Sequence, residues 1–277
     1  MLFIKNLFLS LSFASLFLFS FSLVQAQDVG VTDEIVYEKT SLSKDIRQLK
    51  LQYRGELEEY RNLENLYLIA KDQYYKLGTL ASLEDAVQKT KETMNSRGKV
   101  LETYLRLLRL NLLSQPGIEL PEKKIAEQSL LSALQKLEQH RQEIKKPLDK
   151  PKIAEISEDF EVLIDQIEES VYQTLTVMAI GELQTIHDKA IILKHDMEVE
   201  IATAGGALKS TERKRSFDET DRVLNNLKPE FDAVEEKFTK PTIAGYKEVY
   251  RSIGNNLSLI HSTLSRALTF LRELLKI

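Results

Sequence analysis

The sequence predicts an all-α protein, an elongated antiparallel bundle of about six long amphipathic helices with coiled-coil-like heptad packing. After residue 32, apolar side chains recur at spacings of three and four, the period of a helix face. No segment alternates apolar and polar residues as a half-buried strand would. All six prolines fall at or near breaks in the helical pattern. Because proline is disfavoured in helix interiors, its placement supports the same reading.

The first 26 residues differ in kind from the rest of the chain. Lys5 is followed by an unbroken run of Leu, Phe, Ser, Ala and Val over residues 7–24, and Val24-Gln25-Ala26 matches a signal-peptidase site. We therefore expect residues 1–26 to be a secretory signal peptide and the mature chain to begin at Gln27. The alternative is an uncleaved membrane anchor, because about 18 apolar residues are just long enough to span a bilayer.

Composition narrows the classes of partner and site. The chain has 38 basic and 42 acidic side chains, a net charge of −4, and no cysteine. A mildly acidic chain with interspersed charges argues against nucleic-acid binding, which needs a basic face. The lack of cysteine excludes disulfides, thiolate metal sites and a lipidated cysteine. An exported chain of this kind is typical of a bacterial periplasmic, cell-envelope or secreted protein.

The first two helices are predicted to form a helical hairpin, the domain 27–115. Helix 33–77 carries a heptad stripe that is broken only at Glu56, and Gly78 is placed to end it with a left-handed cap. The turn 78–82 then leads into a second helix with Ser82 as its N-cap and Asp85 three residues on. So short a turn makes the two helices antiparallel neighbours.

The later helices are predicted to form a second bundle, the domain 116–277, which is either separate from the hairpin or continuous with it. A Pro-rich loop at 116–121 precedes a third helix that extends to about Lys146, and 147–151 forms a second hinge. The fourth helix is predicted over 152–204, with a bend or local unwinding where its apolar stripe changes phase around Gly181.

The last part of the chain is predicted to contain two helices after the glycine pair at 205–206. A charged loop at 209–215 leads to a fifth helix, capped by Ser216 and interrupted at Pro229. The sixth helix is predicted from Ile243 to the end, with Thr242 as its cap. Its heptad positions are all apolar or aromatic.

The most unusual feature is a row of tyrosines spaced seven residues apart on the first helix: Tyr53, Tyr60, Tyr67 and Tyr74. Such positions face a neighbouring helix in a coiled coil. They are either a core or rim layer of the protein itself, with each hydroxyl reaching water, or an aromatic surface that binds a partner helix or apolar ligand.

The sequence gives no catalytic site. It contains no nucleophile elbow, phosphate-binding loop or dinucleotide fingerprint. None of the four histidines (140, 187, 195, 261) has the glutamate three residues earlier that di-iron bundles use. His187 and His195 lie eight apart and are either a two-histidine surface site or ordinary solvated side chains. The adjacent carboxylate pairs 58–59, 168–169 and 235–236 are expected on a solvated face.

These observations favour a non-enzymatic extracytoplasmic scaffold or adaptor that acts through helix-mediated protein association, with a protein partner or a second copy of itself. The alternative is a bundle that binds a small ligand, lipid or metal for sensing or carriage. We expect no cofactor, no metal and no nucleic acid. Membrane contact is expected only through an uncleaved amino-terminal segment or the amphipathic carboxy-terminal run 267–277.

Overall fold

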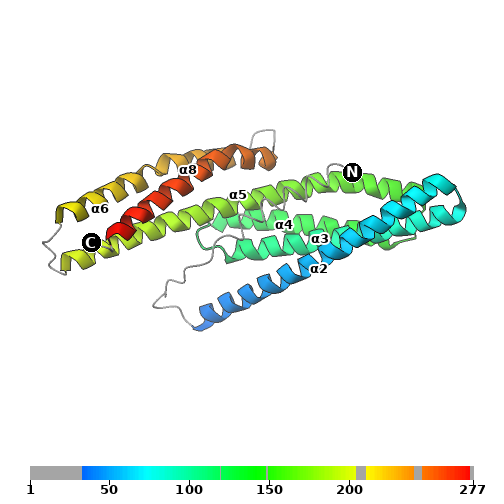
Figure 1. The fold of residues 1–277 in the computed structure, drawn as a ribbon, viewed down its shortest axis with the longest axis horizontal. Helices are drawn as coiled ribbons and strands as arrows, with labels where there is room; N and C mark the ends of the chain where they lie inside the picture. The colour runs from blue at the N-terminus through cyan, green and yellow to red at the C-terminus, as the bar shows by residue number, and fades with distance from the viewer. Residues whose placement is uncertain (1–32, 119, 148, 204–209, 240–244, 275–277) are drawn as a thin grey trace. The chain divides into compact units, whose positions relative to one another are not determined.

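The computed structural model describes residues 33–118, 120–147, 149–203, 210–239 and 245–274 (Figure 1). Within these ranges the chain is helical and has no strand, so the predicted all-α helical bundle is confirmed. The helices are α2 (Asp33–Leu77), α3 (Leu80–Ser114), α4 (Leu120–Lys145), α5 (Lys150–Thr203), α6 (Ser210–Asn225), α7 (Lys228–Thr239) and α8 (Gly245–Leu274).

The chain divides into two compact units, Met1–Ser41 and Leu42–Ile277. Of the first unit only the beginning of α2 is described, and the predicted signal peptide lies outside the described residues. The second unit contains the rest of α2 together with α3 to α8, and all contacts below lie within it. The division of the chain into 27–115 and 116–277 stays a prediction.

The turn between α2 and α3 is tighter than predicted. Gly78 takes a positive φ of 62°, and its N–H donates to the carbonyl oxygen of Tyr74 over 2.9 Å, as expected of a left-handed helix cap. The N-cap of α3 is Thr79 rather than Ser82, because the Thr79 hydroxyl accepts the N–H of Ser82 over 3.2 Å. The helix therefore begins at Leu80, and the connection shortens to two residues.

The long helix α5 belongs to two groups of helices in the second unit (Figure 1). It packs against α3 and α4, and from Glu168 onward it also packs against α8, with smaller contacts to α6 and α7. Large side chains of the first group are almost completely buried; they include Leu105, Leu112, Leu130, Leu137, Phe160 and Ile167. These residues recur at helical spacing, and their burial supplies the main driving force for packing.

The loop after α3 packs closely on α5 at a pair of glycines. Gly117 has a positive φ of 37°, and a β-carbon added to Gly181 would overlap Cγ1 of Ile118. The helix continues through Gly181 without the predicted local unwinding. The glycine in α5 thus allows the backbone of the loop to approach.

The predicted fifth helix is two helices and begins earlier than expected. The charged segment 210–215, predicted as a loop, is the first turn and a half of α6, so Ser216 lies inside a helix and is not its N-cap. The predicted interruption is confirmed, because α6 ends at Asn225 and α7 begins at Lys228. Pro229 occupies the first turn of α7, where its missing N–H is not needed.

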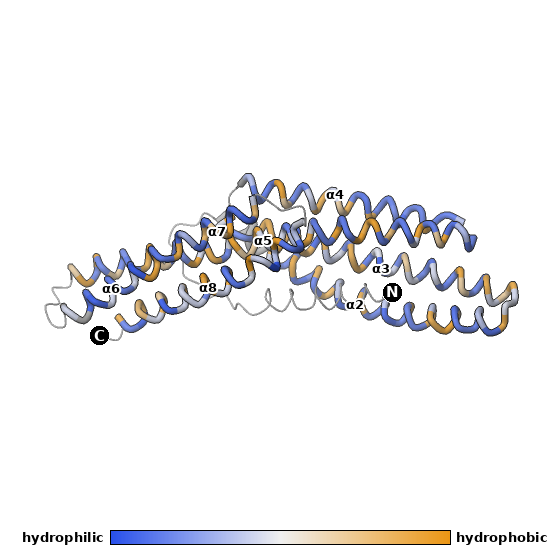
Figure 2. Tube along the Cα trace, turned by 90° about the horizontal axis from the view of Figure 1, so that it is seen from above, coloured by the Kyte–Doolittle hydropathy of each residue, from blue (hydrophilic) through white to orange (hydrophobic). Residues whose placement is uncertain are grey.

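The helix α8 buries the apolar stripe predicted for it. The buried cluster around it joins residues of α5, α6, α7 and α8, among them Ala190, Val223, Val234, Ile253, Ile260, Leu264 and Leu271. In Figure 2 these helices alternate apolar and polar segments along their length, as amphipathic helices do. The predicted cap Thr242, the predicted start Ile243 and the glycines at 205–206 lie outside the described residues.

Candidate functional site: an open groove between α2, α3 and α4

A groove of about 580 Å³ opens where α2, α3 and α4 meet. We call it the α2–α4 groove; it is lined by Asp45, Gln48, Leu49, Gln52, Arg106, Arg109, Leu110, Leu131, Leu134, Gln135 and Glu138. Each helix contributes residues over one to two turns, and each of these turns belongs to a long continuous helix. The groove is therefore held by rigid elements rather than by loops.

Leucines supply the apolar part of the groove. Leu49 of α2, Leu110 of α3 and Leu134 of α4 are half-buried, and Leu131 of α4 is 44% exposed. These four side chains come from three helices and have no further helix of the described chain above them. They offer an apolar contact surface that water covers in the isolated chain.

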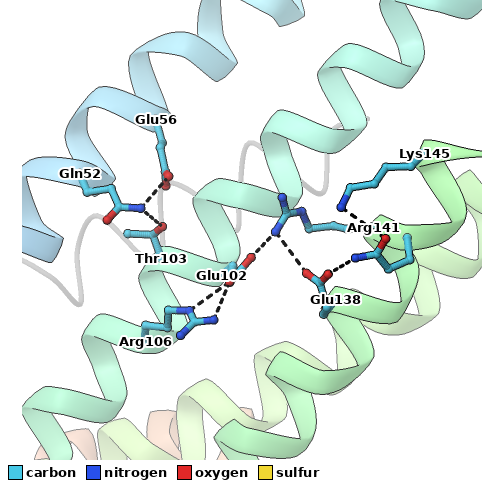
Figure 3. Close-up of polar contacts among 9 residues, drawn as sticks. Gln52, Glu56, Glu102, Thr103, Arg106, Glu138, Arg141 and Lys145 are labelled. Carbon is cyan, nitrogen blue, oxygen red and sulfur yellow. Dashed lines mark hydrogen bonds and ion pairs between the residues drawn. The ribbon is translucent and has the colours of Figure 1, made fainter.

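Ion pairs hold the two arginines of the groove and link α3 to α4. Arg109 pairs with Glu127 of α4 at 2.6 Å, and Arg106 pairs with Glu102 at 2.8 Å. Arg141 of α4 then bridges Glu102 and Glu138 (Figure 3). Because the Arg141 side chain is only 12% exposed, this chain of charges is better shielded from solvent than an ordinary surface pair.

Close backbone packing positions Arg141 in this network. A β-carbon on Gly98 of α3 would lie 2.7 Å from Cγ of Arg141, so the aliphatic part of the arginine lies directly against the helix backbone. Any larger residue at 98 would force the Arg141 side chain to shift. The glycine thus leaves room for Arg141 in its observed position, a role that helix propensity alone does not suggest.

On the α2 side of the groove, Gln52 fixes α2 to α3. Its amide nitrogen donates to Glu56 over 3.0 Å and to the Thr103 hydroxyl over 3.4 Å (Figure 3). One position further along, the rings of Tyr53 and Tyr104 lie 6.0 Å apart. Burial raises the pKa of both phenols, so both hydroxyls stay protonated at neutral pH.

The tyrosine row lies on the face of α2 that turns toward α3. Tyr60 is 5% exposed and its hydroxyl donates to Glu64 over 3.1 Å, while Tyr53, Tyr67 and Tyr74 are half-buried. Tyr74 also accepts a hydrogen bond from Lys150 at the start of α5, over 3.1 Å. This placement favours the core-layer interpretation, and partner binding through the four tyrosines stays a prediction.

Arg97 of α3 and His140 of α4 form a buried basic cluster near the tyrosine row. Arg97 lies on the other side of α3 from the groove residues. The guanidinium of Arg97 lies 3.6 Å from the centroid of the Phe160 ring, and the imidazole of His140 lies 4.9 Å from the same ring. Burial, together with the Arg97 charge, lowers the pKa of His140 to about 4. Burial also lowers the pKa of Arg97, to about 10, so the arginine stays charged at neutral pH.

The histidines do not gather into a metal site in the part of the chain that is described, where no group of three or more His, Asp or Glu could hold an ion. His187 is 3.3 Å from Asp188 and meets the Phe231 ring edge-on at 5.7 Å. His195, two turns further along α5, is exposed. Of the candidate two-histidine pair, His187 is therefore packed and His195 is solvated.

The carboxylates of Glu168 and Glu169 were expected on a solvated face, and that expectation is wrong. Glu168 is 9% exposed and forms an ion pair with Lys247, and Glu169 accepts the backbone N–H of Tyr246 over 2.6 Å. Both hold the beginning of α8 against α5. The pattern of two adjacent glutamates gives no sign of this, because the partners lie much later in the chain.

Comparison with known proteins gives no match to a family model, a curated protein or a solved structure. Over the described residues, none of the helices combines the length and the apolar character that crossing a bilayer requires.

Proposed function

We propose that this chain is a non-enzymatic scaffold or adaptor outside the cytoplasm, and that it holds an amphipathic helix of a partner protein in the α2–α4 groove. The observation that carries the proposal is the groove itself, with leucines from three rigid helices and charged side chains around them. Amphipathic helices bind to other proteins by laying an apolar face into such a groove.

The dimensions of the groove suit a short helical segment. Its α2 residues span 45–52 and its α4 residues span 131–138, which at the rise of a helix is roughly 10 Å on each side. A partner helix of about two to three turns would cover the four leucines. Small-molecule sites instead enclose most of their ligand, so the open form of this groove favours a helix over a small ligand, lipid or metal.

The charged side chains suggest how the partner is oriented. Arg106 and Arg109 of α3 line the groove together with Asp45 of α2 and Glu138 of α4. Acidic residues of a partner helix would meet the two arginines, and its basic residues would meet the flanking carboxylates. Such rim charges set the orientation and rate of binding more than its affinity, which comes from the buried leucines.

The extracytoplasmic location is proposed from the signal-like segment at residues 1–26. If the segment is a cleaved signal peptide, protein recovered from the native host begins at Gln27, which intact-mass measurement determines. A recovered mass that includes Met1 would place the segment in the membrane as an anchor.

The groove is tested by photo-crosslinking in the native host, followed by binding of the captured segment. A photoreactive residue at Leu131 should crosslink to one amphipathic helix of one protein. The same residue at Ile125, 55% exposed on the same helix but outside the groove, should not. A synthetic peptide of that helix should bind the wild type at least tenfold more tightly than Leu131→Asp, a loss of about 1.4 kcal/mol or more.

Two results would contradict the proposal. Equal crosslinking from Leu131 and Ile125 would show that α4 has no preferred face. A captured peptide that binds Leu131→Asp and Ile125→Asp as tightly as the wild type would place its site outside the α2–α4 groove.

A further inference from the structure

One face of the first half of α2 carries a row of positive charges. The positions recur at spacings of three and four, so they share one side of the helix, and the row is about 25 Å long. Glu58 is the single carboxylate on this face, whereas the whole chain has a net charge of −4. We call the row the basic stripe; it consists of Lys44, Arg47, Lys50, Leu51, Arg54 and Arg61.

The basic stripe is open to solvent within the described chain. Its cationic residues are exposed except for Lys50, which is half-buried, and Leu51 in the middle of the stripe is 62% exposed. Another side of this part of α2 is packed, since Tyr60 is 5% exposed. In Figure 1, α2 has α3 along one side. The stripe is thus an unpartnered, charged face of a helix that is held in place from another side.

The described part of the chain does not compensate the positive charges of the stripe. Arg47, Arg54 and Arg61 form no ion pair there, although Glu58 lies four residues after Arg54 and three before Arg61. The two arginines that line the α2–α4 groove, by contrast, are both paired with glutamates. Burial and the neighbouring charge of Arg54 lower the pKa of Lys50. Like charges therefore lie close together on this face, and they give it a positive potential.

We propose that the basic stripe binds the surface of a membrane that contains anionic phospholipids, with α2 lying along that surface. Cations near such a surface are attracted by the negative potential of its lipid phosphates. Small anions bind in enclosed pockets, whereas an open row of cations fits an extended anionic surface. The proposal rests on the location outside the cytoplasm proposed above, where the extended anionic surface is a membrane rather than nucleic acid.

The apolar parts of the stripe favour lipid over an acidic protein surface. Arginine side chains can lay their aliphatic stems in the headgroup region while their guanidinium groups meet phosphates. Leu51 stands among these arginines and can enter the same region. Lipid headgroups rearrange around the convex side of a helix, whereas a folded protein would need carboxylates already placed along a matching concave surface.

The basic stripe and the α2–α4 groove lie on different sides of α2. The helix contributes Asp45, Gln48, Leu49 and Gln52 to the groove. With 3.6 residues per turn, these positions lie about 160° around the helix axis from the stripe. The two surfaces share no residue, so the chain can hold a partner helix in the groove while α2 lies on a membrane. Membrane binding can therefore fail while binding in the groove holds, and the reverse.

The first experiment measures how the protein cosediments with lipid vesicles. The protein is used as it is recovered from the native host, so residues 1–26 are present only if the cell retains them. It should bind vesicles of equal parts phosphatidylcholine and phosphatidylglycerol at least about tenfold more tightly than vesicles of phosphatidylcholine alone. Added salt should remove this difference, because it screens the attraction between exposed charges. Insertion of residues 7–24 would contribute to both kinds of vesicle and would not depend on salt.

A pair of substitutions tests the basic stripe itself. Arg47→Gln combined with Arg54→Gln removes two exposed cations without breaking an ion pair of the described chain. Binding to the anionic vesicles should weaken by at least about tenfold, since each cation near the surface contributes about fivefold. Arg266→Gln combined with Arg272→Gln on α8 removes the same charge from exposed positions and should change binding by less than about twofold. This control also tests the carboxy-terminal run 267–277 as the membrane contact.

A second experiment locates the contact and uses the absence of tryptophan in the chain. Leu51→Trp places a single tryptophan in the basic stripe, and its fluorescence should shift to shorter wavelength when anionic vesicles are added. Val162→Trp is the matched control on α5, at a position that is also 62% exposed, and should not shift. Circular dichroism confirms that each variant keeps its helices.

Three results would overturn the proposal. A wild type that binds neither kind of vesicle, or both equally, would exclude the anionic membrane and leave an acidic protein as the ligand of the stripe. Equal losses from the α2 pair and the α8 pair would show that net charge, and not the basic stripe, determines binding. A fluorescence shift for Val162→Trp without one for Leu51→Trp would place the membrane contact on another face.

Discussion

The carboxylate of Glu169 in α5 accepts the backbone N–H of Tyr246 in the first turn of α8, over 2.6 Å. The first N–H groups of a helix have no partner within it, and the positive end of its dipole attracts an anion. Gly245, with φ of 80°, makes room for the carboxylate, because a β-carbon there would lie 2.7 Å from both of its oxygens. A side chain of one helix thus caps another and attaches the last helix of the bundle.

Removing this cap should destabilise the protein. We expect Glu169→Ala to lower the free energy of unfolding by about 1–2 kcal/mol and Glu169→Gln, which keeps an acceptor oxygen, by less than about 1 kcal/mol. Urea denaturation measures both. Glu158→Ala, at an exposed position of the same helix, is the control and should change stability by less than about 0.5 kcal/mol. Equal losses at 158 and 169 would show that the cap has no special role.

Tyr60 should contribute to stability as a core residue. It is 5% exposed between α2 and α3, so Tyr60→Ala removes a buried ring and should cost on the order of 3 kcal/mol. Tyr75, 73% exposed on the same helix, provides a matched control whose change to alanine should cost less than about 0.5 kcal/mol. Urea melts compare the two variants. A negligible shift for Tyr60→Ala would favour the interpretation of the tyrosine row as a docking surface.

Local patterns in the sequence predict most of the helices, but they predict the helix ends less accurately. The heptad spacing of α2 and α8 and the prolines between helices determine the number and order of the long elements. The sequence placed the N-caps of α3 and α6 at Ser82 and Ser216, whereas α3 is capped by Thr79 and α6 already begins at Ser210. Several Ser and Thr residues near each boundary can act as a cap. Which of them does so depends on how the helix packs, and this is not a local property.

The candidate sites depend on contacts that a sequence pattern does not contain. The α2–α4 groove arises from the relative placement of three helices, and the cap formed by Glu169 joins residues 77 positions apart. Heptad spacing likewise predicts that the tyrosine row shares one face of its helix, but only the fold shows that Tyr60 in that row is buried.

Acid should destabilise the core through His140. The neutral imidazole is buried beside Phe160 and the Arg97 charge, which keeps the folded-state pKa near 4, below the ordinary value of 6.5. Because the folded state prefers the neutral form, its stability is full above about pH 6.5 and falls as the pH decreases toward 4. Asp159 opposes this effect in part. The loss between pH 7 and 4 should be roughly 2–3 kcal/mol.

The variant His140→Leu isolates this contribution, since it keeps an apolar side chain in the core and cannot be protonated. Urea melts at several pH values should show that the difference in stability between wild type and variant changes by roughly 2–3 kcal/mol between pH 7 and 4. Carboxylates that titrate in the same range affect both proteins alike and cancel. If the two proteins lose stability in parallel, the pKa of His140 is the same in the folded and the unfolded state, and its burial has no pH consequence.

Gly181, the single glycine of α5, should not tolerate replacement by alanine. A β-carbon there would overlap the Ile118 side chain and approach the carbonyl oxygen of Gly117 at 3.2 Å. We therefore expect Gly181→Ala to destabilise the protein by about 1–3 kcal/mol, although alanine is the better helix former. Gly254 of α8 gives the matched control, because no atom lies within 4 Å of its added β-carbon. There, alanine should stabilise the protein by about 0.5–1 kcal/mol.

The opposite changes in stability expected for alanine at Gly181 and at Gly254 test whether the loop after α3 packs against α5. Adding Ile118→Ala to Gly181→Ala removes the atom that the new methyl group would strike, so the double variant should lose less than the sum of the two single changes. Part of the cost should remain, because the carbonyl of Gly117 is backbone and cannot be removed by substitution. Thermal or urea unfolding of the four proteins gives the coupling energy directly. A stabilising effect of Gly181→Ala would mean that the loop does not pack against α5 at this glycine, and the close approach of Gly117 would then be wrong as well.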